Sequence, residues 1–161
     1  MHKTSLIAAA TVVLAACSMA QPPIDQRTTQ GPNSQDFFLA RTAIETGREP
    51  TFEERRHWDN QIEDRISDYL REHPEVANSV NVSTFRFERR VVVGMSKEQV
   101  SILIGEPVAM TEDPAEMEKL ARHHWPGVRS RKVTEAWVYP EGWQLYFAGE
   151  KLVDIAQYYK R

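Results

Sequence analysis

The sequence has almost no cysteine: Cys17 is the only one among 161 residues. A single thiol excludes an intrachain disulfide, and it leaves no combination of Cys and His that completes a zinc site. The histidines closest in sequence, His123 and His124, are adjacent and would point about 100° apart on a helix. We therefore expect no metal site and no cofactor.

Glycine is also scarce, and neither positive nor negative charge is in large excess. The chain has seven glycines, and its 20 basic residues are balanced by 23 acidic ones, which gives a formal net charge of -3. Balanced charge provides no broad basic surface, so we expect no nucleic-acid binding. The sequence contains neither a glycine-rich phosphate-binding loop nor a Gly-x-Ser-x-Gly turn. These absences favour a binding protein over an enzyme, although a hydrolase whose carboxylates meet only in the fold stays open as an alternative.

A long hydrophobic run is missing as well. The mainly apolar segment from Leu6 to Ala16 would rise only about 16 Å as a helix, roughly half the thickness of the hydrocarbon core of a membrane. It follows His2 and Lys3 and ends in small residues, which is typical of a secretory signal peptide. We expect residues 1–16 to be removed on export.

The residues at the expected cleavage site, Leu14-Ala15-Ala16-Cys17, resemble the lipobox of bacterial lipoproteins. The resemblance implies lipidation of the Cys17 thiol. Ser18 after it implies the outer membrane, with the folded part facing the periplasm. Several acyl chains would hold the protein stably on a membrane. The alternative is cleavage after Ala20, which leaves no anchor. Residues 17–33, rich in Gln, Pro and Thr, are expected to form a flexible tether.

Capping residues and the spacing of apolar residues predict four helices. Thr51 and Glu54 have the spacing of a capping box, as do Ser96 and Gln99, and Asp113 precedes a proline that suits the first turn of a helix. Residues 74–93 are ambiguous between a short helix and an extended segment. The expected helices run from Ser34 to Gly47, from Thr51 to Glu72, from Ser96 to Gly105 and from Asp113 to about Ala121.

Three segments near the C-terminus, 137–139, 143–147 and 152–159, read as strands joined by short turns. Tyr146 and Tyr158 fall on the more polar sheet face and are candidate partner-binding residues, unless the long helix from Thr51 covers them as core. The predicted fold is α+β, with helices packed on a three-stranded antiparallel β-meander and additional N-terminal helices. We expect a helical region over 34–82 and the α+β domain over 83–161.

Several short motifs follow one another between Val93 and Ile155. They are residues 93–100, Ile104-Gly105-Glu106-Pro107, Trp137-Val138-Tyr139, Leu145-Tyr146-Phe147, and Gly149 with Leu152. Their order resembles the SmpA/OmlA (BamE-like) family of outer-membrane lipoproteins. The resemblance implies a non-catalytic scaffold in cell-envelope or β-barrel outer-membrane protein assembly, with a protein partner. A similar meander occurs in β-lactamase inhibitor proteins, so an inhibitor-like or stress-related binding lipoprotein is the alternative. The oligomeric state is left open.

One local group of basic residues lies in the connection before the strands. On a protein held at a bilayer, basic residues beside a tryptophan can contact anionic lipid headgroups. The alternative is a solvated loop. The candidate headgroup contacts are Arg122, Trp125, Arg129, Arg131 and Lys132.

Overall fold

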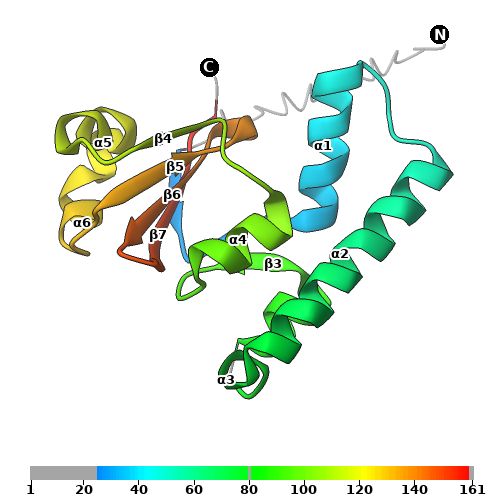
Figure 1. Cartoon of the computed structure of the whole chain (residues 1–161). Coiled ribbons are helices and arrows are strands. Elements are labelled where there is room, and N and C mark those ends of the chain that lie inside the picture. The colour runs from blue at the N-terminus through cyan, green and yellow to red at the C-terminus, as the bar shows by residue number, and fades with distance from the viewer. Residues whose placement is uncertain (1–24, 80, 160–161) are drawn as a thin grey trace, which may run out of the picture.

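The computed structural model describes residues 25–79 and 81–159. Figure 1 shows a twisted antiparallel sheet together with helices, so the predicted α+β class is confirmed. In these ranges the α-helices are α1 (Ser34–Thr46), α2 (Phe52–Glu72), α3 (Pro74–Ala77), α4 (Lys97–Ile104), α5 (Pro114–Ala121) and α6 (Trp125–Arg129). The strands are β1 (Gln26–Thr28), β2 (Gln30–Asn33), β3 (Arg90–Val92), β4 (Ala109–Thr111), β5 (Glu135–Val138), β6 (Trp143–Ala148) and β7 (Lys151–Gln157). Single turns of other helix types are η1 (Thr84–Glu88), η2 (Arg122–His124) and η3 (Pro140–Gly142).

The main sheet is larger than the sequence predicted. Its strand order is β1-β7-β6-β5-β4 and every pair is antiparallel, whereas three strands were expected. A second sheet pairs β2 with β3. The added edge strands β1 and β4 are three residues long, and backbone pairing holds them in the sheet. Strands this short show almost no alternation of apolar and polar residues in the sequence.

Strands β1 and β2 also correct the predicted tether. Residues 26–33 belong to the fold, because Arg27 pairs with Ala156 of β7 and Gln30 pairs with Val92 of β3. Polar side chains do not prevent this, since the ladder uses backbone groups and the side chains can stay in water. Residues 17–24 and the expected signal peptide 1–16 lie outside the described residues.

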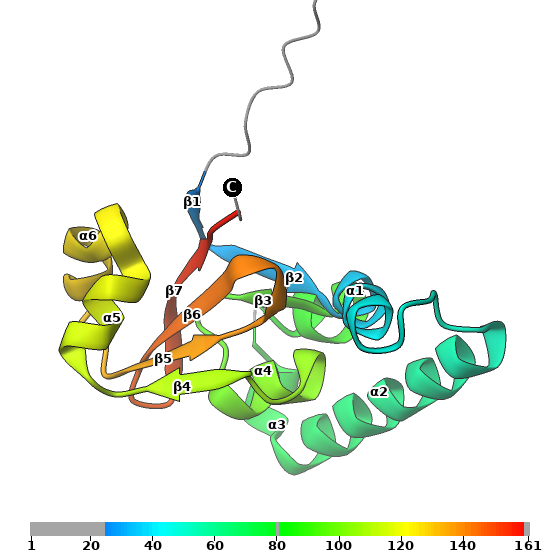
Figure 2. The ribbon, with the colours of Figure 1, turned by 90° about the horizontal axis from the view of Figure 1, so that it is seen from above.

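The sheet lies between two helical layers, as Figure 2 shows. On one side are α4, α1 and the outer helix α2, and on the other side are α5 and α6. The larger hydrophobic core lies on the first side. It joins apolar sheet residues to the helices, and its members include Phe37, Ile62, Ile66, Val100, Leu103, Trp137, Leu145, Phe147 and Ile155. Since it combines residues from 34–82 with residues from 83–161, the predicted boundary near residue 82 does not separate two hydrophobic cores.

The helix starts follow the capping prediction closely. The boxes Thr51/Glu54 and Ser96/Gln99 are both formed, and the Asp113 side chain accepts from the Ala115 N–H at the start of α5. One position differs: Asn33, and not Ser34, caps α1. The Ser34 hydroxyl instead donates to the carbonyl of Arg89, which ties α1 to the residue before β3. The ambiguous segment 74–93 contains α3, η1 and β3.

Candidate functional site

The two tyrosines predicted to bind a partner are part of a second hydrophobic core. Tyr146 is 0% exposed and Tyr158 is 3% exposed. They pack with Met117 and Ala121 of α5 and with Val128 of α6. The prediction of an open aromatic surface is therefore wrong. The connection before β5 contains α5, which the sequence predicted, and α6, which it did not, and the two helices cover this sheet face. The long helix from Thr51 lies on the other side.

Hydrogen bonds confirm that these tyrosines are structural. The Tyr158 hydroxyl donates to the carbonyl of Ala121 at 2.6 Å, and the Tyr146 hydroxyl donates to Oε1 of Gln144 at 2.5 Å. Burial raises the pKa of both hydroxyls, that of Tyr158 to about 12. Both side chains are thus neutral and hydrogen-bonded under α5 and α6.

The five candidate headgroup residues divide into two groups. Arg122 donates to Asp25 at 3.2 Å, and its guanidinium carbon lies 4.5 Å from the centre of the Tyr158 ring. Trp125 is half-buried against the second core. The remaining three are exposed and form no ion pair within the described part of the chain. We call Arg129, Arg131 and Lys132 the basic turn.

Strand β1 contacts α6, the helix that ends at Arg129, the first residue of the basic turn. Arg27 donates to the carbonyl of Gly127 in α6 at 3.1 Å, and its Nε donates to Oδ2 of Asp154 on β7 at 2.8 Å. A Cβ atom on Gly127 would lie 2.3 Å from a guanidinium nitrogen of Arg27, so glycine leaves the space for that side chain. Together with the Asp25–Arg122 pair, these contacts fix the start of the described chain next to α6.

His124 lies near Asp25, Arg27 and Asp154, and no local sequence pattern predicts this polar cluster. Its Nε2 is buried without a hydrogen-bond partner among residues 25–79 and 81–159. Burial lowers the pKa of His124, and the nearby positive charge of Arg27 and the His123 ring act in the same direction. The Asp154 carboxylate is already engaged by Arg27 and by the backbone N–H of Ile155. The cluster therefore joins β1, β7 and α6, and no group of three metal-ligating residues occurs in the described ranges.

Exposed apolar side chains mark a different surface at strand β4. Val108 is 66% exposed and Met110 is 61% exposed. Beside them is a hollow of about 320 Å³ between β4 and α5. Its lining consists of Ala109, Met110, Thr111, Glu116, Lys119, Leu120 and Val138. We call this hollow together with the open side of β4 the β4 edge.

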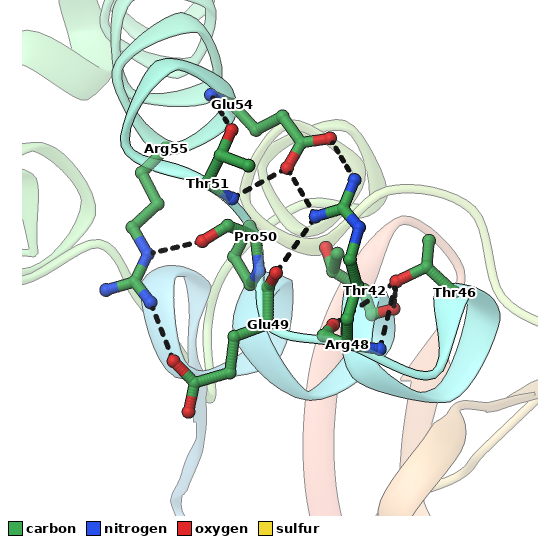
Figure 3. Close-up of polar contacts among 8 residues, drawn as sticks. All are labelled: Thr42, Thr46, Arg48, Glu49, Pro50, Thr51, Glu54 and Arg55. Carbon is green, nitrogen blue, oxygen red and sulfur yellow. Dashed lines mark hydrogen bonds and ion pairs between the residues drawn. The ribbon is translucent and has the colours of Figure 1, made fainter.

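A second apolar hollow lies between α1 and the first turns of α2. Its apolar lining includes Phe38, Leu39, Phe52 and Trp58, and the rings of Phe38 and Trp58 stack with centroids 4.8 Å apart. The connection between these helices is held by polar contacts, drawn in Figure 3. Arg48 donates a hydrogen bond to each carboxylate oxygen of Glu54, and the Thr51 N–H donates a third to Oε2. These hydrogen bonds lower the pKa of Glu54 to about 2, with Arg48 as the largest cause and the Thr51 N–H as the second.

Comparisons with known proteins identify no relative. The chain matches no protein-family model, and no curated protein or solved structure is significantly similar to it. The resemblance to the SmpA/OmlA family therefore stays a prediction. Among the residues with described positions, no helix is both long and apolar enough to cross a bilayer.

Proposed function

We propose that this protein is a bacterial outer-membrane lipoprotein, anchored through Cys17, that acts as a non-catalytic scaffold or binding module on the periplasmic side of the cell envelope. Assembly of β-barrel outer-membrane proteins is the process that the motif order favours. The proposal includes two kinds of contact. Anionic lipid lies against the basic turn, and a protein partner binds elsewhere on the domain.

One observation carries the membrane part of this proposal: β1 enters the fold beside α6, the helix that ends at Arg129 of the basic turn. Asp25 pairs with Arg122, and Arg27 reaches the carbonyl of Gly127. Asp25 follows Cys17 by eight residues, which span at most about 28 Å when fully extended. A lipid on Cys17 would therefore keep the basic turn close to the membrane surface, where each basic residue contributes about 1 kcal/mol with anionic lipid.

The state of the buried polar groups supports binding over catalysis. The Asp154 carboxylate is neutralised by Arg27, and both hydroxyls of Tyr146 and Tyr158 donate to protein acceptors. A general acid or base needs access to substrate, and these groups lie beneath α5 and α6. The exposed apolar surfaces at β4 and between α1 and α2 are instead suited to contact with another molecule.

Flotation of the acylated protein with lipid vesicles tests the proposal. We expect wild-type protein to float with neutral and anionic vesicles through its acyl chains, and to insert preferentially into anionic ones when both are present as it is transferred out of detergent. The triple variant Arg129→Gln, Arg131→Gln, Lys132→Gln should lose that preference and stay membrane-bound. The matched control is Arg65→Gln, Arg86→Gln, Lys151→Gln, which removes the same charge from exposed positions elsewhere.

Equal loss of the preference in both triple variants would show that only net charge matters, and it would remove the assigned role of the basic turn. Cys17→Ala should abolish flotation altogether, because membrane attachment by a few basic residues alone is weak. Retention of the Cys17→Ala protein on vesicles would contradict anchoring through this residue.

A further inference from the structure

Strand β4 forms one edge of the main sheet. It pairs with β5 on one side, and no strand among residues 25–79 and 81–159 pairs with its other side. An edge strand presents unpaired backbone N–H and C=O groups, which are a template for an added strand. The three residues of β4, Ala109, Met110 and Thr111, include no charged side chain that would discourage such pairing.

The hollow beside β4 can accept an apolar side chain from an added strand. Met110, Leu120 and Val138 supply apolar surface to it, and Met110 is largely exposed. Recognition by strand addition combines backbone hydrogen bonds with pockets for alternate side chains. Because β4 is only three residues long, the ladder is short and the hollow must contribute much of the binding free energy.

Charge around the β4 edge indicates the chemistry of the added segment. Exposed acidic residues stand at both ends of the strand, Glu106 before it and Glu112 and Asp113 after it. Asp113 caps α5, whereas Glu106 and Glu112 form no ion pair within the described ranges. Lys119 is the one basic residue in the lining of the hollow. Basic residues in the incoming segment would complement this acidic border.

The same charges disfavour a second copy of this chain as the occupant. Pairing of β4 with its own copy would bring Glu106, Glu112 and Asp113 of both chains to one seam. Like charges placed together at an interface weaken it. The surface therefore favours a different protein.

We propose that the β4 edge binds an extended segment of a partner protein, in which basic residues flank an apolar side chain that enters the hollow at Met110. The segment adds to the main sheet as a further strand beside β4. This inference rests on the proposed function as a binding module and names the partner class and the contact surface.

The probe is a synthetic peptide, Lys-Val-Thr-Leu-Thr-Val-Lys, added to the mature chain carrying Cys17→Ala so that no acyl chain is present. Amide chemical shifts in NMR spectra report the contact surface. We expect shifts at 108–113 and at Leu120, and Met110→Lys should weaken binding at least tenfold. Met110 is exposed, so this variant should fold normally.

Three controls separate strand addition from nonspecific contact. Phe52→Lys, at the apolar hollow between α1 and α2, should leave the dissociation constant unchanged. The double variant Glu106→Gln, Glu112→Gln should weaken binding and reduce its salt dependence. A peptide N-methylated at alternate residues on its bonding edge should not bind, because it cannot donate to the ladder.

Equal binding of the N-methylated peptide, shifts confined to the α1–α2 hollow, or no shifts at all would overturn the inference. Flotation is independent of these results because the peptide experiment uses unacylated protein. Loss of vesicle binding with intact peptide binding would refute the membrane part alone. Normal flotation without peptide binding would refute the β4 site alone.

Discussion

Arg27 on β1 and Asp154 on β7 form an ion pair between residues 127 positions apart in the sequence, with Nε of Arg27 2.9 Å from Oδ1 and 2.8 Å from Oδ2 of Asp154. The Asp154 side chain is 5% exposed, and that of Arg27 is 32% exposed. The pair fastens the first strand of the described chain to the strand next to it. The pair therefore also fixes the position at which the segment that follows Cys17 joins the sheet.

Loss of the arginine should leave a buried carboxylate without its partner. We expect Arg27→Met to lower the free energy of unfolding by about 1–3 kcal/mol, less than a fully buried pair because solvent reaches the guanidinium. Urea denaturation measures the change. The double variant Arg27→Met, Asp154→Asn should be more stable than Arg27→Met alone. Equal stability of the two variants would show that the buried charge is not the cause.

Tyr146 should act as a core residue. Tyr146→Ala removes a fully buried ring between β6 and the α5–α6 layer, and we expect a loss of about 3–5 kcal/mol in the free energy of unfolding. Phe52→Ala is the control, because that ring is 74% exposed and its loss should cost under about 1 kcal/mol. Thermal and urea unfolding of both variants check the expectation. An unchanged midpoint for Tyr146→Ala would contradict the packing of α5 and α6 on the sheet.

Gly142 should tolerate no side chain. Its φ is +77°, and a Cβ atom there would lie 1.8 Å from the backbone oxygen of Tyr158. Gly142→Ala must therefore shift the turn before β6, and we expect a loss of more than about 2 kcal/mol. Gly47→Ala is the matched control: φ is +72° and no atom lies within 4 Å of the added Cβ, so only about 1 kcal/mol should be lost. Equal losses would mean that the close approach to Tyr158 is relieved without cost.

His124 should make stability sensitive to acid. Burial is the main cause that lowers the pKa of His124 below 6.5, and the neighbouring His123 and Arg27 act in the same direction. The unfolded chain therefore binds this proton at a higher pH than the folded protein does. The stability contributed by neutral His124 is present above pH 6.5 and is lost as the pH falls through the lowered pKa. We expect His124→Gln to flatten the fall in melting temperature between about pH 7 and about pH 5. His57→Gln, at an exposed position on α2, should keep the wild-type slope, and parallel curves for all three proteins would refute the assignment.

Local signals in the sequence predicted the helix starts well. The capping boxes at Thr51 and Ser96 need only four neighbouring residues each, and both form as expected. The alternation that assigned Tyr146 and Tyr158 to one sheet face was also correct: both lie in the second core, whereas Leu145 and Phe147 lie in the larger one.

Features that depend on distant residues could not be predicted. Nothing near Tyr146 in the sequence indicates that α5 and α6 fold back over it, and the pairing of Arg27 with Asp154 has no local signature. Short edge strands such as β4 are equally hidden, since three residues define no period. The candidate surface at β4 therefore emerged only from the folded chain.

Anchoring of the protein depends on lipidation of Cys17, which mass spectrometry of the mature N-terminus can detect. Protein purified from bacterial envelopes should yield an N-terminal peptide that begins at Cys17 and carries the mass of a diacylglyceryl group, usually with a third acyl chain. Cys17→Ala should yield no such peptide and should leave the protein off membranes, since the apolar segment 6–16 is too short to hold it there. A mature chain that begins at Gln21 and carries no lipid would rule out anchoring through Cys17.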